Sequence, residues 1–174
     1  TTLFTFKWKI TVDTIKFYQR NKFKSDIKVG GILASLLKRE LEYETGIKPH
    51  FGLWSKVDNL HPDYSILNEH DYYLNNSSLA YTTKGCPNHC SFCAVHILEP
   101  KYVDYIPLKN QLGGDKKDLI LLDNNVLASS EFERIIRDIK INGFYKGAKF
   151  GNGRRRVDFN QGIDARLLTE DKMY

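Results

Sequence analysis

The three cysteines of this chain lie within eight positions of one another, at Cys86, Cys90 and Cys93, in the pattern Cys-x-x-x-Cys-x-x-Cys. An odd number of cysteines in one short segment makes a poor disulfide framework, whereas clustering at this spacing is typical of a metal site. The run Leu79–Thr83 comes directly before the segment and predicts a β-strand, because it is apolar, aromatic and β-branched. We therefore expect a fold in which a β-strand ends directly at a loop that contains all three thiols.

Three thiolates on one short loop can each bind one iron of a cubane cluster, which leaves the fourth iron without a protein ligand. A small molecule can chelate that open iron and receive an electron from the cluster. Two other interpretations of the loop remain open. The cysteines could bind structural zinc together with His89 or His96, or they could form a reactive thiol site.

The loop reads KGCPNHCSFC from Lys84 to Cys93 and resembles the cluster loop of the radical S-adenosylmethionine (SAM) superfamily. The resemblance implies that Cys86, Cys90 and Cys93 bind a [4Fe–4S] cluster. SAM would bind the open iron through its amino and carboxylate groups, with Phe92 near the adenine. It implies an enzyme that cleaves SAM reductively to a 5′-deoxyadenosyl radical, with a reductant such as flavodoxin or ferredoxin; the substrate is unknown. Lys84 stands where many relatives have arginine.

Further elements follow the loop in an alternating series. Asp118–Leu122 is nearly all apolar and predicts a strand that is covered on both faces, and Arg156–Phe159 predicts another strand. Between them, Ser130–Glu133 predicts a capping box at the start of a helix that Gly143 ends. This alternation predicts a parallel α/β unit, in which functional residues gather at the carboxyl ends of the strands.

Asp123, Asn124 and Asn125 follow the second of these strands. Radical SAM proteins often have Gly-Gly-Glu at this place, where it contacts the SAM amino group. The carboxylate and the two amides of this chain are chemically suited to a cationic ammonium. A plain turn at the end of the strand is the alternative interpretation.

Gln161, Asp164 and Arg166 follow the third strand and could face the same pocket. Arg166 could bind the SAM carboxylate with two parallel hydrogen bonds. It could equally take part in a structural ion pair, and the sequence does not decide between the two roles.

The N-terminal region also alternates strand-like and helix-like runs. Thr1–Phe6 and Asp26–Val29 predict strands, while residues 11–20 and 34–45 predict helices, the second of which ends at Gly46. Lys28–Ser35 contains the end of a strand, the glycine pair Gly30-Gly31 and a helix start, and it resembles the last strand-turn-helix of the cobalamin-binding-like domain that precedes the barrel in one branch of the superfamily. A simple turn at the start of a helix is the alternative interpretation of the glycine pair. The Asp-x-His-x-x-Gly motif that would bind cobalt is absent from this sequence, so cobalamin is not supported by this chain.

The resemblance thus implies an α/β chain in three parts. Residues 1–47 would be the C-terminal part of a Rossmann-like (cobalamin-binding-like) domain, 48–76 a linker, and 77–174 the first half of a radical SAM partial (β/α)6 TIM-like barrel. The sequence opens with Thr-Thr-Leu-Phe and ends at Met173-Tyr174 within a predicted helix. We therefore expect an internal fragment of a longer protein, inactive on its own.

Charge and hydropathy limit the partners. No apolar run approaches the roughly 20 residues needed to cross a bilayer, and no signal peptide is evident, so we expect a cytoplasmic protein without a membrane partner. The net charge is +5, and the densest basic run is KGAKFGNGRRR, from Lys146 to Arg156. This run is either a solvated loop or a contact for RNA phosphates. It slightly favours an RNA-modifying radical SAM methyl- or methylthiotransferase, and a non-catalytic zinc-stabilised binding module is the alternative from another class.

Overall fold

The computed structural model describes residues 5–21, 27–58, 60–67, 72–160 and 163–173. The chain divides into two compact units, which are described separately below. Unit 1 comprises Thr1–Asn59 with Ile97–Glu99, and unit 2 comprises Leu60–His96 with Pro100–Tyr174. No helix in the described ranges is long and apolar enough to cross a membrane.

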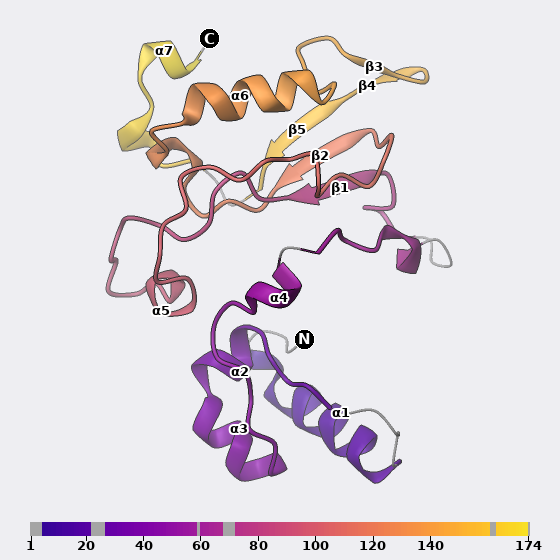
Figure 1. The fold of residues 1–174 in the computed structure, drawn as a ribbon, viewed down its shortest axis with the longest axis vertical. Coiled ribbons are helices and arrows are strands. Elements are labelled where there is room, and N and C mark those ends of the chain that lie inside the picture. The colour runs from indigo at the N-terminus through magenta and orange to yellow at the C-terminus, as the bar shows by residue number, and fades with distance from the viewer. Residues whose placement is uncertain (1–4, 22–26, 59, 68–71, 161–162, 174) are drawn as a thin grey trace. The chain divides into compact units, whose positions relative to one another are not determined.

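Unit 1 is built from helices around a small apolar core (Figure 1). Its elements are the 3-10 helix η1 (Thr5–Lys7) and the helices α1 (Trp8–Arg20), α2 (Ile32–Leu36), α3 (Lys38–Thr45) and α4 (Ser55–Asp58). The core consists of buried aliphatic side chains from α1, α2, α3 and the segment before α2: Val12, Ile15, Val29, Leu33, Ala34 and Leu41. Gly46 ends α3 in the left-handed conformation, with φ of 71°, and its N–H donates to the Glu42 carbonyl, so the predicted helix end is confirmed.

The strands predicted in this unit are not found in its described part. Thr5 and Phe6 lie in η1, while the rest of the run Thr1–Phe6 is outside the described residues. Of Asp26–Val29, residues 27–29 form no strand, and the Val29 carbonyl accepts a hydrogen bond from the His50 N–H at 2.8 Å. Short β-branched runs become strands only where a neighbouring strand pairs with them, and these two runs have no ladder within the described residues.

Unit 2 contains a parallel sheet with strand order β1-β2-β5. The strands are β1 (Ser77–Ala80), β2 (Asp118–Leu121) and β5 (Arg156–Phe159), and Ala80, Leu121 and Phe159 are aligned at their carboxyl ends. The three strands predicted for residues 77–174 and their parallel order are thus confirmed. The protein is mixed α/β, and the wider Rossmann-like and barrel identities stay predictions.

Helix α6 (Phe132–Ile141) covers this sheet, and its side chains contribute to the second apolar core. The core comprises Ala80, Leu108, Leu119, Leu121, Val126, Leu127, Phe132, Ile135, Ile139 and Phe144. Complete burial of a leucine such as Leu119 stabilises the fold by about 1.5–3 kcal/mol. Gly143, with φ of 91°, follows the helix, and the Phe144 N–H donates to the Ile139 carbonyl, which confirms the predicted C-terminal cap.

The predicted capping box at Ser130–Glu133 is wrong. The Ser129 hydroxyl oxygen accepts the Glu131 N–H at 2.9 Å, and the Ser130 hydroxyl donates to the Asp104 carboxylate instead of capping the helix. The helix therefore begins at Phe132, because a distant aspartate competes for the serine that the local pattern selects.

The remaining elements of unit 2 are short. They are η2 (Tyr64–Leu67), η3 (Val126–Ala128), the strands β3 (Lys149–Phe150) and β4 (Gly153–Arg154), η4 (Ala165–Leu167) and α7 (Glu170–Met173). Helix α5 (Val95–Leu98) has its first two residues in unit 2 and its last two in unit 1. Strands β3 and β4 form an antiparallel hairpin that lies between α6 and β5 in the chain. Figure 1 shows this hairpin extending away from the sheet, at the end opposite the strand arrowheads.

Candidate functional site

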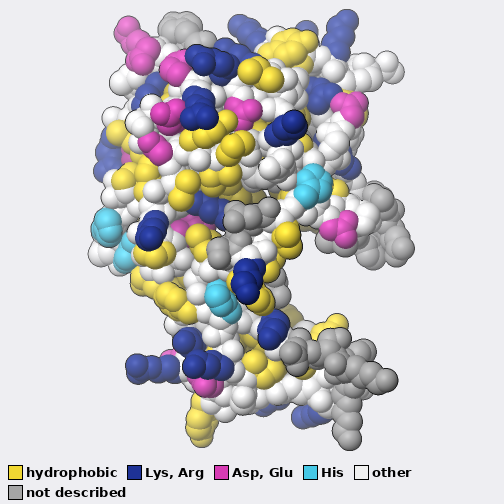
Figure 2. Space-filling view, viewed as in Figure 1, with side chains coloured by type: hydrophobic (Ala, Val, Ile, Leu, Met, Phe, Trp, Pro, Cys, Tyr) yellow, Lys and Arg dark blue, Asp and Glu magenta, His cyan; other side chains and the backbone are white. Residues whose placement is uncertain are grey.

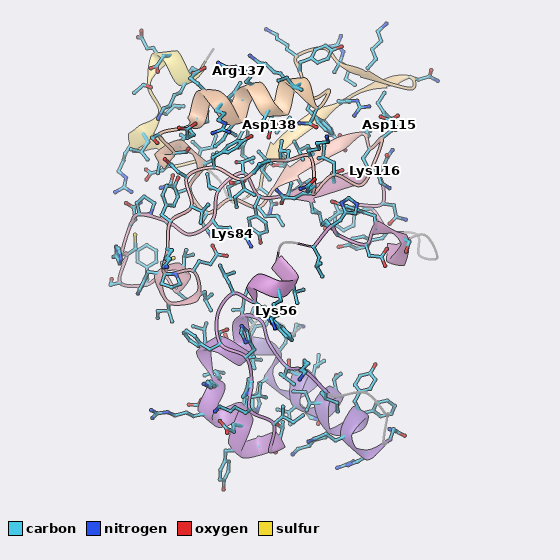
Figure 3. The ribbon with its side chains drawn as sticks, viewed as in Figure 1. Lys56, Lys84, Asp115, Lys116, Arg137 and Asp138 are labelled. Carbon is cyan, nitrogen blue, oxygen red and sulfur yellow. The ribbon has the colours of Figure 1, made fainter. Side chains whose placement is uncertain are left out.

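The candidate site lies at the carboxyl edge of the parallel sheet. The cysteine loop follows β1, the segment Asp123–Asn125 follows β2, and the segment with Asp164 and Arg166 follows β5. Because parallel strands end at the same edge, these three segments are brought together although they are distant in sequence. Figure 3 labels Lys84 near the strand arrowheads, and Asp115 and Lys116 at the opposite end of the sheet.

The start of the cysteine loop is held by backbone hydrogen bonds. Lys84 and Val103 form an antiparallel bridge, in which the Val103 N–H donates to the Lys84 carbonyl at 2.8 Å. Gly85 follows with φ of 75°, a conformation that disfavours side chains, so the chain can turn sharply just before Cys86. The Asn88 N–H then donates to Cys86 Sγ at 3.4 Å. This part of the loop is therefore folded into a definite turn around the first thiol.

The three thiols are free and half-buried. The Cys93 N–H donates to the Cys90 carbonyl at 3.0 Å, which folds the second half of the loop into a turn. Within the described ranges, no group of three or more His, Cys, Asp or Glu side chains is close enough together to hold a metal ion. The loop supplies the thiol ligands that an iron–sulfur cluster uses, without being drawn together around one.

Asp123 anchors the end of β1 to the end of β2. Its Oδ1 accepts hydrogen bonds from the backbone N–H and the hydroxyl of Thr82, at 2.9 and 2.8 Å, and from both the corresponding groups of Thr83. These bonds explain why β1 ends at Ala80 and not at the predicted Thr83: the N–H groups of Thr82 and Thr83 bind a side chain. The carboxylate therefore fixes the chain three residues before Cys86.

The second oxygen of this carboxylate is in a different situation. Asp123 is only 4% exposed, and its Oδ2 is buried with no hydrogen-bond partner among the described residues. Burial raises the pKa of Asp123 above its usual value, and the hydrogen bonds from Thr83 and Thr82 oppose this shift. The predicted contact between Asp123 and the SAM ammonium stays a prediction, and only Oδ2 is free to make it.

Asn125 contacts both the segment that follows β1 and the segment that follows β5. Its Nδ2 lies 3.8 Å from Cys86 Sγ and 3.4 Å from Asp164 Oδ2. Its Oδ1 is buried and has no partner in the described part of the chain, while its backbone carbonyl accepts the Tyr102 hydroxyl at 3.2 Å. The side-chain amide nitrogen and the backbone carbonyl of Asn125 therefore have partners, whereas its side-chain oxygen has none among the described residues. Asn124, the residue between Asp123 and Asn125, is half-buried.

Arg166 forms a bidentate ion pair with Asp164. Arg166 Nε donates to Asp164 Oδ1 and Arg166 Nη2 to Asp164 Oδ2, both at 2.8 Å. The guanidinium of Arg166 holds the pKa of Asp164 well below its usual range. Asn88 Nδ2 also approaches Asp164 Oδ2, at 3.4 Å. Of the two roles expected for Arg166, the structure contains the ion pair, and its binding of a SAM carboxylate stays a prediction.

For Phe92 and Gln161, the structure does not test the predicted contact with SAM. Phe92 is 91% exposed on the cysteine loop, so its predicted place near adenine stays a prediction. Gln161 lies outside the described residues.

Sequence reasoning gave no role to Asn88, Tyr102, Thr82 or Thr83. Burial raises the pKa of Tyr102 to about 12, and the negative charges of Asp104, Asp123 and Cys86 add to this shift. Asn88 could have been noticed as the one amide inside the cysteine motif, but nothing in the sequence indicates that Tyr102 reaches Asn125.

Comparison with protein-family models, with curated proteins and with solved structures found no match to this chain.

Proposed function

We propose that Cys86, Cys90 and Cys93 bind a [4Fe–4S] cluster and that the protein is a radical SAM enzyme. The observation that carries the proposal is the contact of Asn125 with both Cys86 and Asp164, at 3.8 and 3.4 Å. Through it, the residues that follow all three parallel strands meet at the first cysteine of the loop. This is the edge of a parallel sheet at which cofactor sites are built.

The donor set fits such a cluster. Three thiolates from one loop match three irons of such a cluster, and all three thiols are free. When bound, the reduced cluster would supply the electron that cleaves SAM to methionine and a 5′-deoxyadenosyl radical. The chain's own residues would hold and orient the cofactors.

The orphaned oxygens support a ligand with hydrogen-bond donors. Asp123 Oδ2 and Asn125 Oδ1 are both buried without a partner in the described ranges. Leaving a buried acceptor unsatisfied costs about 1–3 kcal/mol, so a ligand that donates to these atoms would recover that free energy. The ammonium of SAM donates hydrogen bonds and carries a positive charge, which also suits the Asp123 carboxylate.

The N–H groups near Cys86 would act on the cluster itself. The Asn88 N–H and the Asn125 amide both face Cys86 Sγ. Hydrogen bonds to cluster sulfurs help to set the reduction potential, so these two donors would make the cluster easier to reduce. A flavodoxin or ferredoxin would be a suitable source of the electron.

A zinc-stabilised module without catalysis is the second candidate. The rings of His89 and His96 lie 5.6 Å apart beside the loop, and His96 Nδ1 is buried without a hydrogen-bond partner in the described part of the chain. A histidine with the three thiolates would complete a four-ligand zinc site.

Anaerobic reconstitution distinguishes the two candidates. The chain would be incubated with iron and sulfide or with zinc, and bound iron, sulfide and zinc would be counted for the wild type and for Cys86→Ala, Cys90→Ala and Cys93→Ala. Ser91→Ala is the matched control, since Ser91 is exposed within the same loop. The proposal expects a cubane complement in the wild type and the control, and its loss in each cysteine variant. Stoichiometric zinc that depends on His96, with no stable cluster, would replace it by the second candidate.

A further inference from the structure

The β3–β4 hairpin carries the densest positive charge of the sequence. No acidic residue occurs between Asp138 and Asp158, and this stretch includes the run from Lys146 to Arg156. Strands β3 and β4 are joined by Gly151 and Asn152, and Gly151 has φ of 52°, as a tight hairpin turn requires. Figure 2 shows dark blue Lys and Arg side chains gathered at the top of the view, over α6 and the hairpin.

Two arginines of the run are used within the fold. Arg155 stacks its guanidinium over the rings of Phe144 and Phe150, at 5.1 and 5.4 Å, and forms an ion pair with Asp115. Arg156 forms an ion pair with Asp118 at 2.9 Å. These contacts hold the base of the hairpin against the amino edge of the sheet.

The other basic side chains face solvent. Lys146, Lys149 and Arg154 are exposed, and none of them forms an ion pair with the described residues. Lys149 and Arg154 are also direct partners across the hairpin, so two like charges stand opposite each other. Like charges directly opposite each other destabilise a two-stranded ribbon, and an anion bound between the two groups would relieve this repulsion.

Two further side chains extend this surface. Lys117 lies against the hairpin, since its Cε would be 3.7 Å from a Cβ at Gly153. Tyr145, at the base of the hairpin, is 57% exposed. Cations that are spaced along a ribbon match successive phosphates, and an exposed aromatic ring offers a stacking surface for an unpaired base.

We propose that the β3–β4 hairpin is a docking surface for single-stranded RNA. Lys149, Arg154 and Lys146 bind the phosphate backbone, and Tyr145 stacks on a base. Asn152 at the tip is exposed, and its amide can both donate a hydrogen bond to a 2′-hydroxyl and accept one from it. The hairpin precedes β5 and the cysteine loop follows β1, so they lie at opposite ends of the sheet, separated by at least the roughly 13 Å length of a four-residue strand. RNA docking therefore goes beyond the proposed cluster function and does not depend on it.

Binding would be measured by fluorescence anisotropy with a labelled oligouridine and the full 174-residue chain, without reconstitution, at several salt concentrations. The decisive variant is Lys149→Glu, which puts opposite charges across the ribbon. The proposal expects affinity to fall about tenfold, and the slope of log affinity against log salt to shrink by about 0.7 for each phosphate that the variant no longer binds. Thermal stability should be unchanged or higher, because the like-charge pair is removed. Arg154→Ala should weaken binding similarly.

Lys109→Glu is the matched control, because Lys109 is exposed in the same unit and the net charge changes equally. Equal reductions of affinity in Lys149→Glu and Lys109→Glu would overturn the proposal in favour of non-specific attraction to the net charge. Equal affinity for a deoxyuridine strand of the same length, or for polyglutamate, would overturn the assignment to RNA. Iron content after reconstitution tests the cluster separately, so failure of one proposal leaves the other standing.

Discussion

The Asp123 carboxylate accepts both the backbone N–H and the hydroxyl of Thr83, three residues before Cys86. One oxygen thereby ties the end of β2 to the segment that leads into the cysteine loop, while the other oxygen stays buried and unpaired among the described residues. Asp123 consequently combines a structural role with a candidate binding role, and substitutions can separate the two.

Asp123→Ala should destabilise the protein strongly. It removes the acceptor of four hydrogen bonds and leaves the buried donors of Thr82 and Thr83 unpaired, which we expect to cost at least about 2 kcal/mol. Urea unfolding would measure the decrease in unfolding free energy. Asp158→Ala, at an exposed position on β5, is the control and should change the unfolding free energy little.

Asp123→Asn should separate folding from SAM binding. An amide oxygen can replace Oδ1 as the acceptor for Thr82 and Thr83, but an NH₂ group then takes the place of Oδ2. SAM affinity of the reconstituted protein should fall about tenfold or more, since a donor opposes the ammonium, while iron content stays complete. Equilibrium dialysis would measure it. Unchanged affinity with an intact cluster would reduce Asp123 to a structural anchor.

The ion pair between Asp164 and Arg166 should make stability sensitive to acid. The pKa of Asp164 is lowered in the folded protein, mainly by the hydrogen bond from Arg166, so the carboxylate favours the folded state above its unfolded pKa of about 3.8. This contribution is lost as the pH falls below that value. Wild type should therefore lose more unfolding free energy than Asp164→Asn as the pH falls from about 4 to about 2, that is, from the unfolded pKa towards the lowered folded pKa. Parallel curves for the two proteins would contradict the assignment.

Tyr102 should ionise at unusually high pH. Its pKa is raised to about 12 by burial and by nearby negative charges, so its hydroxyl remains a donor to the Asn125 carbonyl throughout the neutral range. The difference in phenolate absorbance between wild type and Tyr102→Phe should develop near pH 12. A step near the ordinary tyrosine pKa of about 10 would show that the hydroxyl is exposed in solution.

The sheet and the cysteine loop could be predicted because their signals are local. The apolar run before Asp123 predicts a strand, which β2 confirms, although its residues alternate between half-buried and buried instead of being equally covered on both faces. The three thiols mark their own loop. The anchor on Thr82 and Thr83 could not be predicted, because Asp123 is 40 residues away from Thr83 in sequence and reaches it only once β1 and β2 pair.

The predicted capping box and the predicted N-terminal strand at Thr5 and Phe6 were wrong because contacts from outside each short sequence pattern determined the local structure. Ser130 has the sequence context of a helix cap, but the Asp104 carboxylate binds its hydroxyl. Thr5 and Phe6 have strand-forming side chains, yet they continue into the amphipathic helix α1. In both cases the deciding contact or packing surface lies outside the window that the pattern covers.

Asn125 should tune the reduction potential of the cluster. Its Nδ2 is 3.8 Å from Cys86 Sγ, and a donor near a thiolate stabilises the reduced, more negatively charged cluster. Asn125→Leu keeps the side-chain size, removes the donor, and also removes the buried Oδ1 that has no partner among the described residues. The midpoint potential should therefore become more negative while iron and sulfide contents stay at the wild-type level.

Redox titration followed by electron paramagnetic resonance would measure that potential. Asn152→Leu, at the exposed tip of the β3–β4 hairpin, is the matched control and should leave it unchanged. Asn125→Ser should lie between the wild type and the leucine variant, because a hydroxyl is a shorter donor that restores part of the hydrogen bonding. An unchanged potential in Asn125→Leu with a full cluster would show that the amide does not face the bound sulfur. Loss of the cluster in Asn125→Leu but not in Asn125→Ser would instead assign the residue to assembly of the loop.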